Sequence, residues 1–98
     1  MSIRLEGQVA IVTGAGQGLG RCHAIALAER GAMVVVNDLG DDSGHFANAA
    51  AVVAEIEAAG GVAMANGANV ANFEQVESMI AAAMENWGRV DILINNAG

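Results

Sequence analysis

Four short apolar runs alternate along the chain with three longer stretches of helical periodicity. The runs cover residues 9–12, 33–36, 62–65 and 92–94, and the helical stretches cover 19–30, 46–59 and 73–87. Short continuous apolar runs are typical of strands that are covered on both faces. Strands joined by crossover helices run parallel, with right-handed connections. The sequence therefore predicts an α/β fold of order β-α-β-α-β-α-β, a doubly wound parallel sheet with strand order 3-2-1-4.

The third helical stretch has the clearest amphipathic pattern. Its predicted core-facing stripe consists of Phe73, Val76, Ile80, Ala83, Met84 and Trp87. Asn72 followed by Gln75 resembles a capping box at the start of this helix. Glycines also follow each helical stretch, where a left-handed C-cap is expected, at Gly31, Gly60 with Gly61, and Gly88.

Charge and composition exclude several classes of function. The net charge of −7, with four Arg and no Lys, argues against nucleic acid or an anionic membrane as a partner. The apolar runs are too short to span a bilayer. The single Cys22 cannot form an internal disulfide and reads as a small packing residue, so a reducing cytoplasm is the expected location. His23 and His45 lack the spacing of a metal site, and we expect no metal.

A glycine-rich loop, VTGAGQGLGR at residues 12–21, follows the first predicted strand and opens the first predicted helix. This is where a parallel sheet of this type binds nucleotide phosphates, because backbone N–H groups and the helix dipole converge there. GxGxxG fails in every register and the Lys of a P-loop is missing, but TGxxxGxG fits from Thr13 to Gly20. The loop predicts a phosphate site built from backbone; the alternative is a glycine-rich turn without a ligand.

Asp38 ends the second strand, about 20 residues beyond the glycine loop. A carboxylate there can accept hydrogen bonds from both hydroxyls of an adenosine ribose, whereas the 2′-phosphate of NADP would be repelled. Asp41 and Asp42 add to that repulsion, and no Arg or Lys follows nearby. The sequence favours NAD as cofactor; a solvated acidic turn is the alternative.

Taken together, these motifs resemble the short-chain dehydrogenase/reductase family. The matching residues are the loop from Thr13 to Gly20, Asp38 after the second strand, and the NNAG motif at 95–98 after the fourth. The stretches VVVNDLG, ALAERGA and GRVDILINNAG are also similar to the (3R)-hydroxyacyl-CoA dehydrogenase part of peroxisomal multifunctional enzymes and their bacterial relatives. The resemblance implies a Rossmann-like fold, an oxidoreductase and a nicotinamide cofactor.

The family's cofactor-binding roles transfer to this chain position by position. The resemblance implies a pyrophosphate loop at Gly14, Gly16, Gln17, Gly18, Leu19 and Gly20. It places Asp38 on the adenine ribose, and Asn69 and Val70 in the adenine-contacting position, where the family usually has Asp. The nicotinamide-side ribose is assigned to Asn96, Ala97 and Gly98, and Asn95 to stabilisation of the central strands.

Catalytic residues are predicted to be missing from these 98 residues. The family depends on a Tyr and a Lys four residues apart, with a Ser and a further Asn, beyond the NNAG motif, and this sequence contains no Tyr and no Lys. We therefore expect residues 1–98 to be the N-terminal part of one NAD-binding domain, truncated before the catalytic segment and inactive alone. The parent is expected to act on a secondary alcohol or ketone. The substrate that we favour is a 3-hydroxyacyl thioester, such as an acyl-CoA.

Two alternatives stay open at this point. One is a non-catalytic dinucleotide-binding module. The other is an NADPH-dependent 3-oxoacyl carrier-protein reductase, which Asp38 disfavours. Because family members commonly form dimers or tetramers, the resemblance also implies a homo-oligomeric parent.

Overall fold

The computed structural model describes residues 4–16, 18–39 and 47–96 of the chain. Strands and helices alternate as the sequence predicts, and each predicted element ends within about one residue of its observed bounds. The elements are β1 (Val9–Thr13), α1 (Gly18–Glu29), β2 (Met33–Asn37), α2 (Ala47–Ala58), β3 (Val62–Asn66), α3 (Phe73–Trp87) and β4 (Ile92–Asn95).

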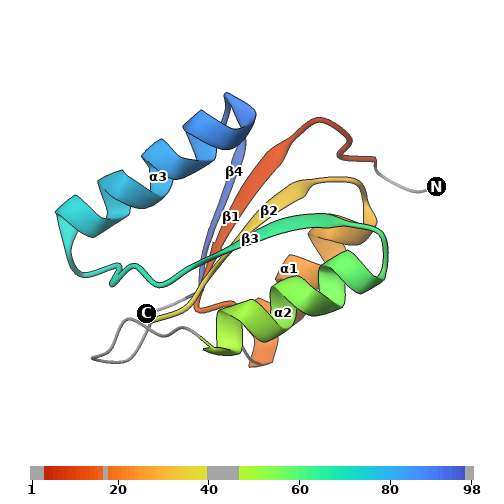
Figure 1. Cartoon of the computed structure of the whole chain (residues 1–98), viewed down its shortest axis with the longest axis horizontal. Coiled ribbons are helices and arrows are strands. Elements are labelled where there is room, and N and C mark those ends of the chain that lie inside the picture. Colours follow the sequence, from red (N-terminus) through yellow and green to blue (C-terminus); the bar gives the residue numbers. More distant parts are fainter. Residues whose placement is uncertain (1–3, 17, 40–46, 97–98) are drawn as a thin grey trace.

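The four strands form one parallel sheet in the order β3-β2-β1-β4, which confirms the predicted topology. Helices cover both faces: α1 and α2 lie on one side and α3 on the other (Figure 1). The side chains of β2 alternate between these layers, since Val34 and Val36 pack with α1 and α2 while Val35 packs with α3. The buried, continuously apolar strands follow from this two-sided cover.

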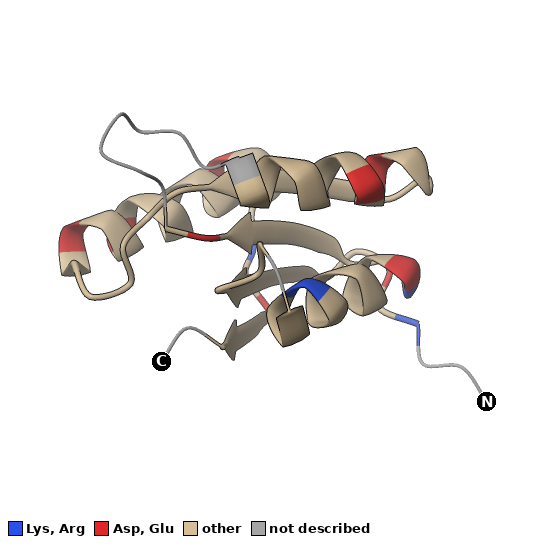
Figure 2. Cartoon of the chain, turned by 90° about the horizontal axis from the view of Figure 1, so that it is seen from below, with Lys and Arg blue, Asp and Glu red and all other residues tan. Residues whose placement is uncertain are grey.

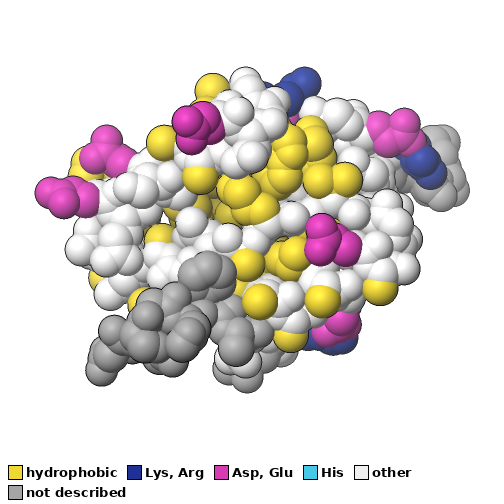
Figure 3. Space-filling view, viewed as in Figure 1, with side chains coloured by type: hydrophobic (Ala, Val, Ile, Leu, Met, Phe, Trp, Pro, Cys, Tyr) yellow, Lys and Arg dark blue, Asp and Glu magenta, His cyan; other side chains and the backbone are white. Residues whose placement is uncertain are grey.

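Helix α3 contacts the sheet with a different set of residues from the predicted stripe. Met79 and Ala83 are buried and Val76 and Trp87 partly buried, whereas Phe73, Ile80 and Met84 are 75%, 41% and 47% exposed. The apolar arc of α3 is wider than the face that meets the sheet, so the prediction was wrong for one edge of the arc and omitted Met79. Figure 3 shows hydrophobic side chains gathered on this side of the molecule.

The exposed edge of α3 borders a cavity of about 180 Å³ above β1 and β4. Its lining is largely apolar and consists of Ile11, Thr13, Val70, Val76, Met79, Ile80, Val90, Leu93 and Asn95.

No helix in the described part of the chain is long and apolar enough to cross a membrane.

Two methionines of α3 should differ sharply in their contribution to stability. Met79 is 1% exposed, so we expect Met79→Ala to lower the free energy of unfolding by about 2–5 kcal/mol through lost burial and a cavity. Met84→Ala removes a side chain that is 47% exposed and should change it by less than about 1 kcal/mol. Urea denaturation of both variants measures the difference. A loss for Met84→Ala equal to or larger than that for Met79→Ala would contradict this packing of α3.

The ends of the helices carry the caps that the sequence suggests, with one correction. Asn72 Oδ1 accepts the N–H of Gln75 at 3.1 Å, as an N-cap should. Gln75 does not complete a capping box, because its Oε1 accepts the N–H of Asn69 at 2.7 Å instead. The predicted left-handed C-caps are confirmed at Gly31, Gly60 and Gly88, whereas Gly61 has no positive φ.

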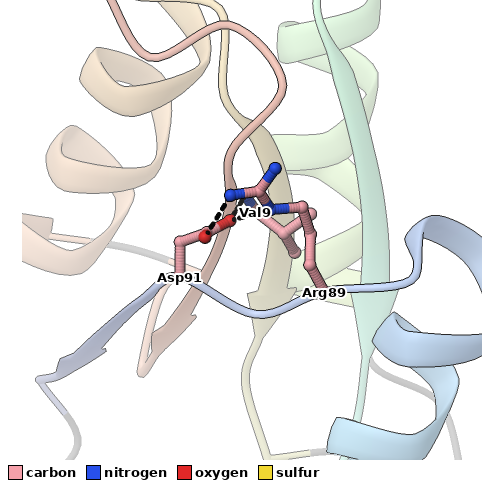
Figure 4. A network of polar contacts seen from close by, with 3 residues as sticks. All are labelled: Val9, Arg89 and Asp91. Carbon is pink, nitrogen blue, oxygen red and sulfur yellow. Dashed lines mark hydrogen bonds and ion pairs between the residues drawn. The ribbon is translucent and has the colours of Figure 1, made fainter.

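Asp91 fastens the start of β4 to the start of β1 (Figure 4). Its carboxylate accepts the backbone N–H of Val9 at 2.8 Å and two hydrogen bonds from Arg89, at 2.8 and 2.7 Å. The hydrogen bonds from Arg89, followed by the one from Val9, hold the pKa of Asp91 below its usual 3.8. The ionised form is therefore the one that the fold favours.

This pKa shift predicts acid sensitivity. Because the folded pKa of Asp91 is lower than the unfolded one, its stabilisation is complete above about pH 4 and is lost as the pH falls through the folded value. We expect Asp91→Asn to lower the Tm by about 3 °C at pH 7, and the difference from the wild-type Tm to shrink as the pH falls below the usual 3.8. Circular dichroism melts across this range measure the effect, with Glu57→Gln on α2 as control. A Tm difference that does not narrow in acid would contradict it.

Candidate functional site

The glycine loop leaves β1 and enters α1 through conformations that favour glycine. Gly14 and Gly18 have φ of 62° and 60°, in the left-handed region. Between them, Ala15 is buried and its N–H donates to the backbone oxygen of Asn37 at 2.7 Å, which fixes the loop to the end of β2. The loop is therefore held by backbone contacts, and α1 begins at Gly18 with its first N–H groups facing outward from the helix end.

Gly20 allows the first turn of α1 to lie directly against the start of the loop. A Cβ at this position would stand 2.3 Å from Gly14 O and 2.7 Å from Asn96 Nδ2. Asn96 Nδ2 itself donates to Gly14 O at 3.3 Å, and its backbone N–H donates to Thr13 Oγ1 at 3.0 Å. The two sequence motifs thus meet at the carboxyl ends of β1 and β4.

Thr13 links the central strands at the same point. It is 3% exposed, and its hydroxyl lies 3.2 Å from Asn95 Oδ1 and 3.4 Å from the oxygen of Ile94. Asn95 is paired in register with Thr13 across β1 and β4. This contact fits the strand-stabilising role expected for Asn95.

Asp38 lies immediately after β2 and faces the glycine loop. A Cβ on Gly16 would stand only 2.0 Å from Asp38 Oδ2 and 2.6 Å from the Cβ of Asn48. The other carboxylate oxygen, Oδ1, accepts the N–H of Leu39 at 2.9 Å. Gly16 therefore provides the space in which the Asp38 carboxylate lies against the loop.

A cavity of about 290 Å³ opens at the carboxyl ends of β1, β2 and β3. It brings together segments that are far apart in sequence, and its lining consists of Gly14, Asn37, Asp38, Leu39, Ala68, Asn69, Val70 and Ala71. In open α/β sheets, ligands bind outside the carboxyl ends of the strands. This cavity is the candidate site.

The charges around the site suit a ligand whose phosphates meet backbone N–H groups. The first turn of α1 contains no acidic residue that would place negative charge at the positive end of its dipole. Among the described residues that line the cavity there is no Arg or Lys, and Asp38 is the one ionisable side chain. Figure 2 shows acidic residues spread over the helices and basic residues at few, separate places. Within the described ranges no group of three or more His, Cys, Asp or Glu could hold a metal ion.

Three arginines form ion pairs with acidic residues away from the cavity, and Arg21 is one of them. Its guanidinium pairs with Glu55, which joins α1 to α2, and this hydrogen bond together with the charge of Glu55 raises the pKa of Arg21. Arg4 and Arg89 pair with Glu6 and Asp91. These three ion pairs lie outside the residues that line the cavity.

The structure brings together part of the predicted cofactor site. Gly14, Asp38, Asn69 and Val70 line the cavity, and Gly16, Gly20 and Asn96 contact it through Asp38 or Gly14. Leu19 lies in the first turn of α1 and is 65% exposed. Gln17, His45, Ala97 and Gly98 lie outside the described residues. Cys22 is exposed, which corrects its interpretation as a packing residue.

Sequence reasoning missed four residues of the cavity lining, the apolar Leu39, Ala68 and Ala71 and the polar Asn37. Asn37 is 1% exposed at the end of a valine-rich strand, and it lines the cavity. A buried Asn must find hydrogen-bond partners, so an Asn directly after three valines is the signal that could have identified it.

Comparison with known proteins adds an independent line of evidence. A family model described as short chain dehydrogenase matches residues 8–98. A mouse relative named peroxisomal multifunctional enzyme type 2 is 50% identical over 98% of this chain, which spans 13% of that protein. A Synechocystis relative named 3-oxoacyl-[acyl-carrier-protein] reductase is 48% identical over 96% of the chain, which spans 36% of it. Both names agree with the two enzyme groups considered from the sequence.

Solved structures agree with the fold. A short chain dehydrogenase from Mycobacterium avium aligns with a TM-score of 0.89 and 52% identity, over 96% of this chain and 34% of that one. A 7α-hydroxysteroid dehydrogenase, solved in complex with NADH and 7-oxo glycochenodeoxycholic acid, aligns with a TM-score of 0.87 and 41% identity, over 97% and 35%. The chain thus spans about a third of the solved proteins that it matches.

Proposed function

The chain belongs to the short-chain dehydrogenase family, and on that premise we propose that it forms the NAD-binding part of an oxidoreductase. The parent reaction would transfer hydride between nicotinamide and a secondary alcohol or ketone. The observation that carries this proposal is the single cavity at which the glycine loop, Asp38 and the Asn69–Val70 segment meet. These three features are separated in sequence and converge only in the fold.

The residues of the cavity match the parts of a dinucleotide. Gly14, Gly16, Gly18 and Gly20 carry no side chain beside the backbone N–H groups that a pyrophosphate would meet at the start of a helix. Asp38 would accept hydrogen bonds from the adenine ribose, and Asn69 would face the adenine ring. Bound NAD would supply the hydride acceptor; the protein's own groups at this cavity bind and orient.

The choice of NAD over NADP rests on Asp38. A 2′-phosphate would bring negative charge to the side chain of Asp38, and the lining that the structure describes contains no cationic side chain to neutralise it. The Synechocystis relative supports a second candidate, a 3-oxoacyl carrier-protein reductase that uses NADPH. Asp38 weighs against this candidate.

A 3-hydroxyacyl thioester is our proposed substrate, and the similarity to a peroxisomal multifunctional enzyme supports it. We also propose a homo-oligomeric parent, as the family resemblance implies. A cytoplasmic location stays a prediction from the sequence; the mouse relative is a peroxisomal enzyme by its name.

Titration with NAD and NADP tests the cofactor assignment. We expect the chain to bind NAD at least about 10-fold more tightly than NADP, and Asp38→Ala to weaken NAD binding about 10- to 100-fold, because hydrogen bonds to a charged group contribute about 1.5–3 kcal/mol. NADP binding should weaken less or improve. Isothermal titration calorimetry measures both constants, and Glu77→Ala, on the exposed surface of α3, serves as the matched loss of a carboxylate. Equal affinities of the unaltered chain for the two dinucleotides would refute the assignment.

A further inference from the structure

Asn37 carries a polar side chain into the core at the end of β2. Its Nδ2 lies 3.1 Å from Ala68 O, 3.2 Å from Asn66 Oδ1 and 3.4 Å from Asn66 O. All three atoms are acceptors, so the buried amide group donates only to the chain that leaves β3. A buried amide of this kind is retained only where its hydrogen bonds are made.

The segment that Asn37 holds has little other support from the sheet. β3 ends at Asn66, and beyond it the backbone is held by side-chain amides, since Asn66 Oδ1 accepts the N–H of Ala68 at 2.8 Å. Farther on, Asn69 Oδ1 accepts the N–H of Ala71 at 2.9 Å. The Asn37 amide therefore ties the start of this segment to β2, beside the backbone hydrogen bond that Asp38 N–H donates to Asn66 O at 3.0 Å.

Asn37 also contacts the opposite wall of the cavity through its backbone. Its oxygen accepts the N–H of Ala15 from the glycine loop at 2.7 Å, and the next residue is Asp38. One residue thus joins the phosphate loop, the ribose carboxylate and the wall formed by Ala68, Asn69 and Val70. The amide sets the separation between that wall and Asp38.

We propose that Asn37 is a positioning residue for the adenine side of the dinucleotide site, acting through the wall formed by residues 68–70. This inference rests on the proposed function. It goes beyond that function by making base binding depend on a buried side chain that positions the wall. Removal of the amide should displace the wall and leave Asp38 and the glycine loop in place, because β2 pairs with β1 and β3 through its backbone.

Two ligands distinguish binding of the adenine base from binding of the sugar phosphate, because AMP contains both parts and ribose 5-phosphate lacks the base. We expect Asn37→Leu, which keeps the volume and removes the donor, to weaken AMP binding at least 10-fold and ribose 5-phosphate binding less than 2-fold. Asp38→Ala should weaken both. NMR titration measures the constants, and Asn86→Leu on the exposed face of α3 is the matched control. Equal losses for the two ligands, or an unchanged AMP affinity, would overturn the proposal.

A milder variant and a measurement without ligand keep the test independent of folding and of the proposed function. Asn37→Ser retains a hydroxyl too short to reach Ala68 O and should weaken AMP binding in the same direction. Amide hydrogen exchange at Ala68 should accelerate in both variants while exchange at Val35, in the centre of β2, stays protected. If the unaltered chain bound no NAD, the function would fail; accelerated exchange at Ala68 would still support the positioning contact, and unchanged exchange would overturn it.

Discussion

Gly20→Ala is expected to abolish measurable NAD binding while adding a single methyl group. The new Cβ would stand 2.3 Å from Gly14 O, a backbone atom that cannot rotate away. Either α1 or the glycine loop must therefore shift, and the loop N–H groups then lose their alignment toward the pyrophosphate. Loss of two hydrogen bonds to a charged group, at about 1.5 kcal/mol each, weakens binding at least about 100-fold. Overpacking should also lower the free energy of unfolding by about 1–3 kcal/mol.

Two further variants show whether the backbone contact is responsible. Gly60→Ala, at the C-cap of α2, has φ of 89° and no atom within 4 Å of the added Cβ, so it should cost about 1 kcal/mol in stability and leave NAD affinity unchanged. Asn96→Ala combined with Gly20→Ala removes the side-chain contact at 2.7 Å but keeps the one with Gly14 O. Calorimetric titration of folded protein measures binding in each. Restored affinity in the double variant would contradict the role of the backbone oxygen.

The order of elements and most of the helix caps followed from local patterns in the sequence, and the parallel sheet followed from the rules for crossover connections. Runs such as residues 33–36 are apolar throughout because both of their faces are buried, and this pattern predicts parallel strands directly. Gly31, Gly60 and Gly88 were identifiable because a left-handed C-cap favours glycine. These features can be predicted without knowing which side chains contact one another in the folded protein.

The buried face of α3 and the role of Asn37 could not be predicted in the same way. Periodicity defines an apolar arc on a helix, but the sheet contacts only part of that arc, and the choice of Met79 over Met84 depends on how α3 lies across β1 and β2. The partners of Asn37 are 29 and 31 residues away, at Asn66 and Ala68. The register that aligns Asn37 with Asn66 is a tertiary fact, and only the structure reveals it.

The 98-residue chain is expected to bind NAD without oxidising an alcohol. Hydride can leave the carbinol carbon only as a base takes the hydroxyl proton, and a positioned acid or base contributes about 10²–10⁴ in rate. The family resemblance assigns this role to a Tyr supported by a Lys, and the sequence contains neither. Of the described residues that line the cavity, Asp38 alone is ionisable, and it belongs to the adenine end in the proposed function.

Turnover with NAD and a 3-hydroxyacyl thioester measures this expectation through the absorbance of NADH. We expect no NADH above the rate of the Gly20→Ala variant, which controls for contaminating dehydrogenases because it lacks the binding loop geometry. NADH formation that scales with chain concentration and disappears in Gly20→Ala would contradict the prediction and place a base among these residues. Binding without turnover is also what a non-catalytic dinucleotide-binding module would show. The oxidoreductase and the non-catalytic module can be distinguished with a longer parent protein that carries the family's Tyr and Lys. Only the oxidoreductase proposal requires that this protein convert the substrate.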